Sequence, residues 1–373
     1  MSAAPGPGAS GFGTRLRAAT ARWGPLCVGI DPHPALLAGA GLEVDSAGLA
    51  AFTDRCVEAF SGRVAVVKPQ VSLFEAFGSD GFAVLEDAVS RLRDAGTLVV
   101  LDAKRGDIGS SNDGYARAWF GQGAPLRCDA VTLSPYLGEG SLTGIVEAAR
   151  DDGAGVFVLC RTSNPEAGAL QTAVRADGGS VAAGIARWAE GFDGDVGLVV
   201  GVTVSDALES LPLASGSAPL LAPGFGAQGG GADDLARVFG TEAPRVLASV
   251  SRDILRHGGS VDALRAAFDA GREHERTNPA DARPWELPTE DGAVIVPADG
   301  YEAIDATWSN LRVDRLSIRA GEVTWSGELT DDEGRLPVTM TVRLQASRIS
   351  LTVEAKGADA VVVHSAQELG TVG

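Results

Sequence analysis

The sequence predicts a (β/α)8 barrel followed by a small antiparallel all-β domain. Before about residue 279, short apolar runs alternate with segments of helical period, and after it the apolar period drops to two. The early runs are rich in β-branched residues and nearly continuous, as expected for parallel strands buried on both faces. Eight such strand–helix repeats in about 270 residues are the number and size of a (β/α)8 barrel.

The predicted barrel strands cover residues 26–31, 64–70, 98–104, 129–135, 155–162, 196–202, 219–223 and 245–251. Amphipathic stretches between them predict helices over residues 50–60, 82–94, 141–150, 181–190, 233–239 and 261–272. A doubly wound sheet is the alternative. It seldom needs eight repeats, however, and no Gly-x-Gly-x-x-Gly motif follows the first strand.

Residues 279–290 contain three prolines and read as a linker between the two predicted domains, 1–278 and 291–373. After the linker, apolar residues alternate with polar ones at 316–318, 323–325, 338–344 and 349–353. Polar or glycine-containing segments fall where the chain should reverse. This pattern predicts an antiparallel meander with one solvated face, forming a small sandwich or partial barrel.

Charge and composition exclude several classes of protein. The net charge is −18, from 49 acidic and 31 basic residues, which argues against a nucleic-acid-binding protein. The first eleven residues lack the charged and apolar segments of a signal peptide, and no apolar run is long enough to span a membrane. The four cysteines stand singly, which predicts buried reduced thiols in a cytoplasmic protein.

Lysine is scarce in this chain. Only three of the 31 basic residues are lysines, namely Lys68, Lys104 and Lys356. Arginine stays protonated in proteins, whereas a lysine ammonium can give up a proton. Lys68 and Lys104, which both fall at predicted strand ends, are therefore the first candidates for reactive groups.

Polar residues follow most of the predicted barrel strands. In a barrel of this kind, active-site groups project from the carboxyl ends of the strands. One such residue alone could be a helix cap or half of an ion pair, but a whole ring of them favours a functional site. The ring contains Asp31, Lys68, Asp102, Lys104, Thr132, Ser163, Thr203, Gln228 and Arg252.

The densest part of this ring is the segment 102–107. Strand side chains alternate, so Asp102 and Lys104 should share the inward face while Ala103 takes the other. Asp107 follows Gly106 in the loop. Two carboxylates and an ammonium this close together perturb one another strongly, which is typical of a reactive site.

Six motifs at successive strand ends resemble those of the orotidine 5′-phosphate decarboxylase family, in its longer bacterial branch (type 2). The resemblance covers about residues 10–275 and does not extend to the C-terminal region. The motifs are Gly29-Ile-Asp31-Pro, Val67-Lys68-Pro-Gln70, Asp102-Ala-Lys104-Arg-Gly-Asp107, Arg161-Thr-Ser163-Asn-Pro, Pro223-Gly-Phe-Gly-Ala-Gln228 and Ser251-Arg252-Asp253.

The resemblance implies conversion of orotidine monophosphate (OMP) to uridine monophosphate (UMP) and CO2, the last step of pyrimidine nucleotide synthesis, without metal or organic cofactor. It implies a homodimer, with Asp107 and Ser111 reaching the partner's site. Lys104 would protonate C6 within a network of the four catalytic residues Lys68, Asp102, Lys104 and Asp107. The resemblance also implies the contacts to the substrate. Asp31 and Lys68 would bind the ribose, which Ser111 would approach from the partner chain, and Ser163 would face the pyrimidine. Gln228 and Arg252 would bind the phosphate, beside Pro223.

Two departures from the family pattern stand out. Ser251 occupies a position where many members have glycine, and Ser111 one where threonine is common. The nearest alternative function is a related barrel lyase, an aldolase or β-keto acid decarboxylase, acting on a sugar phosphate with a divalent metal. Another is an inactive scaffold whose C-terminal sheet binds a partner, and an interaction module is the default expectation for that region alone.

Overall fold

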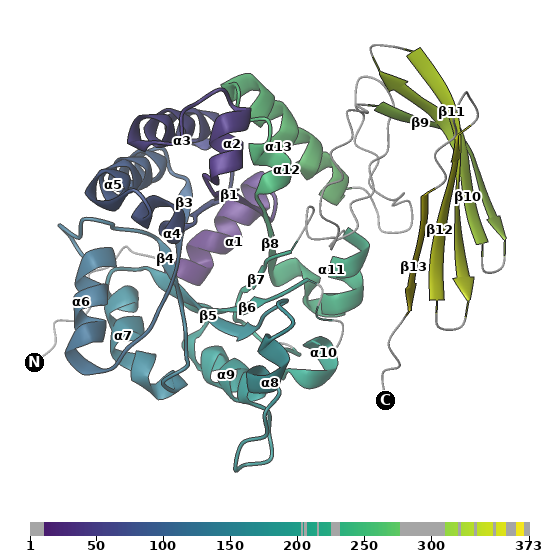
Figure 1. Ribbon diagram of the computed structural model, residues 1–373. Helices are drawn as coiled ribbons and strands as arrows, with labels where there is room; N and C mark the ends of the chain where they lie inside the picture. The colour runs from purple at the N-terminus through teal and green to yellow at the C-terminus, as the bar shows by residue number, and fades with distance from the viewer. Residues whose placement is uncertain are drawn as a thin grey trace, which may run out of the picture. The chain divides into compact units, whose positions relative to one another are not determined.

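Eight parallel strands close into a barrel in sequence order, with β8 paired to β1 (Figure 1). The computed structural model describes residues 11–276, apart from 203, 205–206, 215 and 225–231, together with five later strands. The barrel strands are β1 (Leu26–Ile30), β2 (Val66–Pro69), β3 (Leu98–Arg105), β4 (Ala130–Leu133), β5 (Gly155–Arg161), β6 (Val196–Val200), β7 (Leu220–Ala222) and β8 (Val246–Val250).

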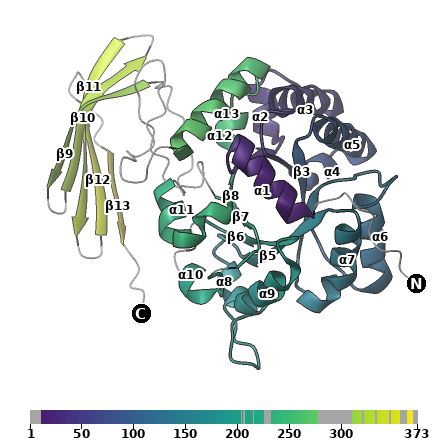
Figure 2. The same cartoon turned by 180° about the vertical axis from the view of Figure 1, so that it is seen from behind.

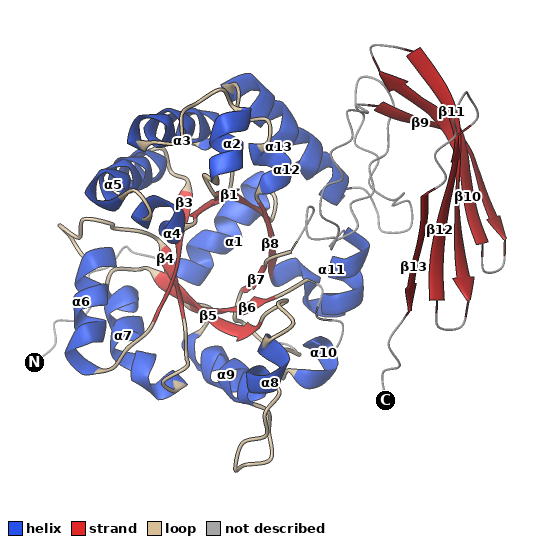
Figure 3. Ribbon diagram, viewed as in Figure 1, coloured by secondary structure: helices blue, strands red, loops and turns tan. Residues whose placement is uncertain are grey.

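Helices surround this barrel (Figure 3). The α-helices are α1 (Phe12–Trp23), α2 (Pro34–Gly39), α3 (Ser46–Phe60), α4 (Val71–Glu75), α5 (Gly78–Asp94), α6 (Gly109–Trp119), α7 (Thr143–Asp151), α8 (Ala167–Gln171), α9 (Val181–Ala189), α10 (Ala207–Ser210), α11 (Ala232–Phe239), α12 (Arg252–Leu255) and α13 (Val261–Arg276). Three short 3-10 helices cover Glu139–Leu142, Glu190–Phe192 and Gly240–Arg245.

The barrel prediction is confirmed, including all eight strands. Seven of the eight strands observed are shorter than predicted, by one to three residues, whereas β3 extends one residue further, to Arg105. The six helices predicted from amphipathic stretches are present, with ends shifted by a few residues. The amphipathic pattern did not give bounds for the other seven α-helices, of which α1 has the largest structural consequence.

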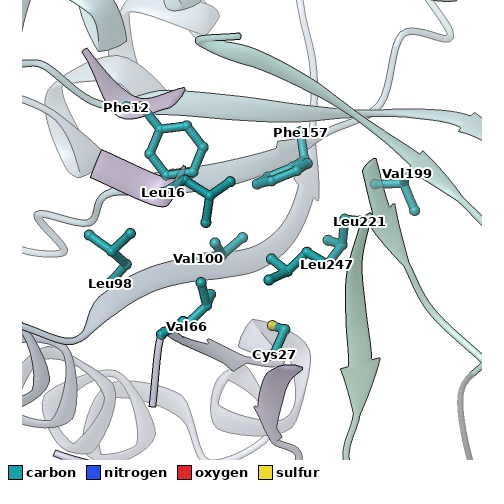
Figure 4. Packing of buried hydrophobic residues seen from close by; sticks show 12 residues of the cluster. Phe12, Leu16, Cys27, Val66, Leu98, Val100, Phe157, Val199, Leu221 and Leu247 are labelled. Carbon is teal, nitrogen blue, oxygen red and sulfur yellow. The ribbon is translucent and has the colours of Figure 1, made fainter. Parts of the chain in front are cut away.

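Helix α1 lies across one end of the barrel, in front of the strands in Figure 2. Its Phe12 and Leu16 join a buried cluster with strand residues, shown in Figure 4. The rings of Phe12 and Phe157 pack edge to face with centroids 5.8 Å apart. Gly155 makes this possible, since a Cβ there would lie 2.4 Å from the Phe12 ring. The helix therefore seals the amino-terminal end of the barrel and leaves the other end for chemistry.

Contacts divide the chain into two units, Met1–Ala282 and Arg283–Gly373. In the second unit five strands form one antiparallel meander: β9 (Asn310–Arg319), β10 (Glu322–Asp331), β11 (Gly334–Gln345), β12 (Arg348–Ala355) and β13 (Val363–Glu368). The predicted antiparallel meander is thus present, and within the described residues its five strands pair as one sheet, without the second sheet or closure of the predicted sandwich or partial barrel.

All four cysteines are buried and free, as the sequence predicted. A search of the described helices finds none that is long and apolar enough to cross a membrane.

Candidate functional site

The side chain of Asp102 binds two lysines inside the barrel. Its Oδ2 accepts a hydrogen bond from Lys68 Nζ at 2.8 Å, and its Oδ1 accepts one from Lys104 Nζ at 2.6 Å. Gln70 Nε2 approaches Oδ2 at 3.4 Å, and the Thr132 hydroxyl donates to Oδ1 at 2.9 Å. The neighbouring strands β2, β3 and β4 carry these groups: β2 carries Lys68, β3 carries Asp102 and Lys104, and β4 carries Thr132.

Charge pairing keeps the cluster ionised despite its burial. Burial by itself raises the pKa of Asp102, but the Lys68 and Lys104 ammoniums outweigh it and hold that pKa well below the usual range. Burial likewise lowers the pKa of Lys68, but the charges of Asp102 and Asp31 raise it by more than burial lowers it. The net pKa of Lys68 therefore lies above that of a free lysine. Both groups therefore stay charged over the whole physiological pH range.

Lys68 and Lys104 differ in exposure. The Lys68 side chain is 7% exposed and the Lys104 side chain 44%. Lys68 is thus the buried member of the pair, while Lys104 faces the open mouth of the barrel. Below them the Cys27 thiol is fully buried, and burial raises its pKa to about 12, so it remains a neutral thiol.

The backbone at Lys104 departs from the regular alternation that the sequence predicted. Its φ is +49°, in the left-handed region, and strand β3 is irregular between Leu101 and Arg105. A non-glycine residue in that region costs about 1–3 kcal/mol and persists only where its surroundings enforce it. Here the bulge turns Lys104 so that its ammonium still reaches Asp102, two residues earlier.

Asp31 and Ser251 meet above Gly29 at the same end of the barrel. A Cβ on Gly29 would lie 2.8 Å from Ser251 Cβ and 3.2 Å from Asp31 Oδ1, so only glycine fits there. Within the described part of the chain, Asp31 Oδ1 and Ser251 Oγ are buried polar atoms with no hydrogen-bond partner. Such atoms are rare in native proteins, and a bound ligand with hydroxyl groups would satisfy them.

Asp107 and Ser111 lie apart from the cluster. The Asp107 carboxylate accepts a bond from the backbone of Ile108, and no contact among the described residues joins it to Lys68, Asp102 or Lys104. Asn112 fixes this loop, since it binds both backbone groups of Asp107 and the Ser141 carbonyl. Ser111 is exposed at the start of α6.

The remaining predicted residues follow later strands. Ser163 lies beyond β5, exposed and packed against Gly201 after β6. Pro223 directly follows β7, and its carbonyl accepts a bond from Val202. Arg252 is exposed at the start of α12, after β8. Gln228, like Thr203, lies outside the described residues.

Sequence reasoning missed Gln70 and gave no role to Thr132. Both contact Asp102: Thr132 belongs to β4, and Gln70 directly follows β2. Gln70 follows Lys68 at the strand period of two, a signal that could have placed the two side chains on one face.

A separate cavity of about 320 Å³ lies at the amino-terminal end of the barrel, beside α1. It is lined by residues of α1 and of the segments before β7 and β8, including Arg17 and Arg245. Arg245 is already paired with Glu190 and Glu242. This cavity does not include the lysine–aspartate cluster, so it is not the predicted site.

Comparison with known proteins decides the family. The family model described as orotidine 5′-phosphate decarboxylase / HUMPS matches residues 24–267. The chain belongs to this family. An orotidine 5′-phosphate decarboxylase of Streptomyces coelicolor is 54% identical over 264 residues, which cover 69% of this chain and 94% of that protein.

Solved structures agree with the family assignment. The crystal structure of a Streptomyces avermitilis protein, provisionally given the name orotidine 5′-phosphate decarboxylase, is 52% identical with a TM-score of 0.70. It covers 73% of this chain and 96% of its own. OMP decarboxylase of Leishmania donovani is 32% identical with a TM-score of 0.59, over 73% of this chain and all of its own. The orotidine 5′-phosphate decarboxylase / HUMPS match ends before β9, so it leaves the C-terminal sheet unassigned.

We expect Asp102→Asn to destabilise the barrel in a pH-dependent way. The folded pKa of Asp102 is lowered, so its stabilising effect is complete above the unfolded value of about 3.9 and is lost as pH falls through the folded pKa. Removing the charge takes away the counter-ion that the two ammoniums share, which should cost about 3–5 kcal/mol at pH 7. Urea unfolding between pH 7 and pH 3 should show this difference shrinking below about pH 4.

Asp262→Asn is the matched control, because the Asp262 side chain is 96% exposed. Its effect should stay within about 0.5 kcal/mol at every pH. A difference between wild type and Asp102→Asn that does not change with pH would contradict the assigned cause.

Proposed function

We propose that this chain decarboxylates orotidine 5′-phosphate to UMP and CO2 in pyrimidine nucleotide synthesis. Membership of the family and the names of relatives about 50% identical over the whole barrel support this function. The observation that carries it is the Lys68–Asp102–Lys104 cluster at the carboxyl end of the strands. It supplies a proton donor in a fixed position without using any cofactor.

The chemistry requires a positive group beside C6 of the pyrimidine. When the bond from C6 to the carboxylate breaks, CO2 leaves and the electron pair remains at C6, where the ring delocalises it poorly. A lysine ammonium stabilises that developing charge and then transfers a proton to C6. Lys104 fits this role because it is the exposed lysine of the cluster and Asp102 holds its ammonium at 2.6 Å.

The other groups then bind the parts of the substrate that do not react. Asp31 and Lys68 hold the ribose, in keeping with the unsatisfied Asp31 Oδ1. Ser163 faces the pyrimidine near Pro223, while Gln228 and Arg252 bind the phosphate. Contacts to the phosphate and ribose provide binding energy that positions the ring against Lys104.

A metal-dependent aldolase or β-keto acid decarboxylase is less well supported. Among the described residues, no group of three or more His, Cys, Asp or Glu side chains could hold a metal ion. The Asp102 carboxylate already accepts bonds from two ammoniums, which compete with any cation for its oxygens.

We expect the purified protein to convert OMP to UMP after treatment with EDTA. Lys104→Ala should lower kcat by at least about 10⁴-fold, because it removes both the charge and the proton donor. Lys104→Arg should be almost as poor, since arginine retains the charge but does not donate its proton. A spectrophotometric assay of OMP consumption measures all three.

Binding of UMP, measured by calorimetry, is the control that separates chemistry from folding. It should survive in Lys104→Ala. Activity that disappears with EDTA and returns with a divalent metal would support the metal-dependent lyase instead.

The chain also acts as a homodimer, with Asp107 and Ser111 completing the partner's site. Asp107 is held in a loop away from its own cluster, and Ser111 is exposed beside it. Large apolar side chains flank these residues, with Ile108 62% exposed, Tyr136 76% and Leu137 53%. The loops that carry them lie side by side, since Asn112 binds the Ser141 carbonyl. Exposed apolar side chains that gather in one place on a surface are typical of an interaction site.

Mixed dimers test this arrangement. A dimer of one Lys104→Ala chain and one Asp107→Ala chain has one complete site if Asp107 acts across the interface, and none if it acts within its own chain. Each homodimer should be nearly inactive, and the mixed dimer should recover about half of the wild-type rate per dimer. A mixed dimer of Lys104→Ala and Asp102→Ala should recover nothing, because both residues serve their own site.

We also propose that residues 291–373 constitute a separate all-β domain and that residues 279–290 link it to the barrel domain, 1–278. The match to the Streptomyces coelicolor relative covers 94% of that protein, so nearly all of that enzyme is barrel. The sheet is therefore not needed for the reaction, and its expected role is to bind a partner. The four free cysteines support a cytoplasmic location.

A chain that ends after Asn278 should fold, dimerise and decarboxylate OMP within about threefold of the full-length kcat, as expected for an independent domain. Activity assays and light scattering of both chains test this. Aggregation or loss of dimerisation in the short chain would show that the sheet is a structural part of the enzyme.

A further inference from the structure

Strand β3 carries three residues where its neighbour β4 carries one. Leu101 pairs with Val131 and Arg105 pairs with Leu133, so Thr132 alone stands opposite residues 102–104. Extra residues in a bulge leave backbone groups without partners in the strand ladder. The Lys104 N–H is such a group, and it donates to the Thr132 hydroxyl oxygen at 2.9 Å.

The Thr132 hydroxyl makes a second bond, to the cluster itself. It donates its proton to Asp102 Oδ1 at 2.9 Å, and the residue is only 1% exposed. A hydroxyl has one proton, and an ionised carboxylate can only accept. The direction of both bonds is therefore fixed, with the proton toward Asp102 and a lone pair toward the backbone of Lys104.

We propose that Thr132 is a positioning residue for the decarboxylation, an inference that rests on the proposed function. It does not reach the reacting atoms. Its hydroxyl joins the carboxylate of Asp102 to the left-handed backbone of Lys104, so that the ammonium is held from both ends. Without this hydroxyl the Lys104 N–H and the carboxylate each lose a buried partner, and the bulge is free to relax.

The expected result is a loss of rate without a loss of binding. Asp31 follows β1, Lys68 lies on β2 and Arg252 follows β8, so the proposed ribose and phosphate contacts do not depend on the bulge, and ground-state binding stays intact while the proton donor is misplaced. A displacement of about 1 Å at a reacting group can cost about 10²-fold in rate. A change confined to kcat identifies an interaction that acts in the transition state.

Thr132→Val removes the hydroxyl and keeps the shape of the side chain. It should lower kcat for OMP about 10²-fold and leave KM within about threefold. Thr132→Ser restores a hydroxyl on the same carbon and should return kcat to within about fivefold of wild type. A merely structural role would not give this rescue together with an unchanged KM.

Thr53→Val is the matched control. Thr53 is 2% exposed in α3, and within the described residues its hydroxyl has no hydrogen-bond partner. This variant removes the same atom from an equally buried threonine and should keep wild-type kcat. The thermal midpoints of the two valine variants, measured alongside, should lie within a few degrees of each other.

Three results would overturn the inference. They are a wild-type kcat in Thr132→Val, an equal loss in Thr132→Ser and Thr132→Val, and a loss that appears only in KM. If the wild type and Thr53→Val do not decarboxylate OMP at all, the proposed function itself fails, and the role of Thr132 fails with it. Failure of the Thr132 inference and failure of the proposed function are distinguishable, because only failure of the proposed function leaves the wild type unable to decarboxylate OMP.

Discussion

The arrangement of the barrel mouth depends on one buried carboxylate. Asp102 lies on β3 with Lys68 from β2 on one side and Thr132 from β4 on the other, so three consecutive strands meet at a single side chain. A buried carboxylate is tolerated only when its oxygens are saturated by donors. Each donor must therefore be held in register, and this ties the backbone of three strands to the charge of one residue.

The same constraint accounts for the irregular backbone at the carboxyl end of β3. A regular strand would bring Lys104 to the same face as Asp102 at a fixed spacing. The bulge and the left-handed backbone of Lys104 instead turn its ammonium back onto Asp102 while leaving it accessible. The opposite end of the barrel is closed by α1, whose Phe12 packs against Phe157, so the apolar packing around α1 and the charged cluster lie at opposite ends of the barrel.

The strands could be predicted because barrel strands are buried on both faces and so form continuous apolar runs. The cluster of Lys68, Asp102 and Lys104 could be placed at one end because polar residues terminate those runs. Helix α1 was missed because much of it is polar and only a few side chains, such as Phe12 and Leu16, enter the core. The bulge was missed because strand alternation carries no sign of an extra residue, and the role of Thr132 depends on that bulge. Asp107 lies apart from the cluster because it is in the loop after the bulge, where strand alternation does not apply.

The scarcity of lysine has a consequence for chemical labelling. Between residues 11 and 276 the chain has only two lysines, and one of them, Lys68, is almost completely enclosed. The surface of the barrel thus carries its positive charge on arginine, which reagents for primary amines leave untouched. An acylating reagent that meets this barrel finds a single accessible lysine side chain, and that amine is Lys104. Occupancy of the mouth by a nucleotide could then be followed simply as protection of one amine from modification.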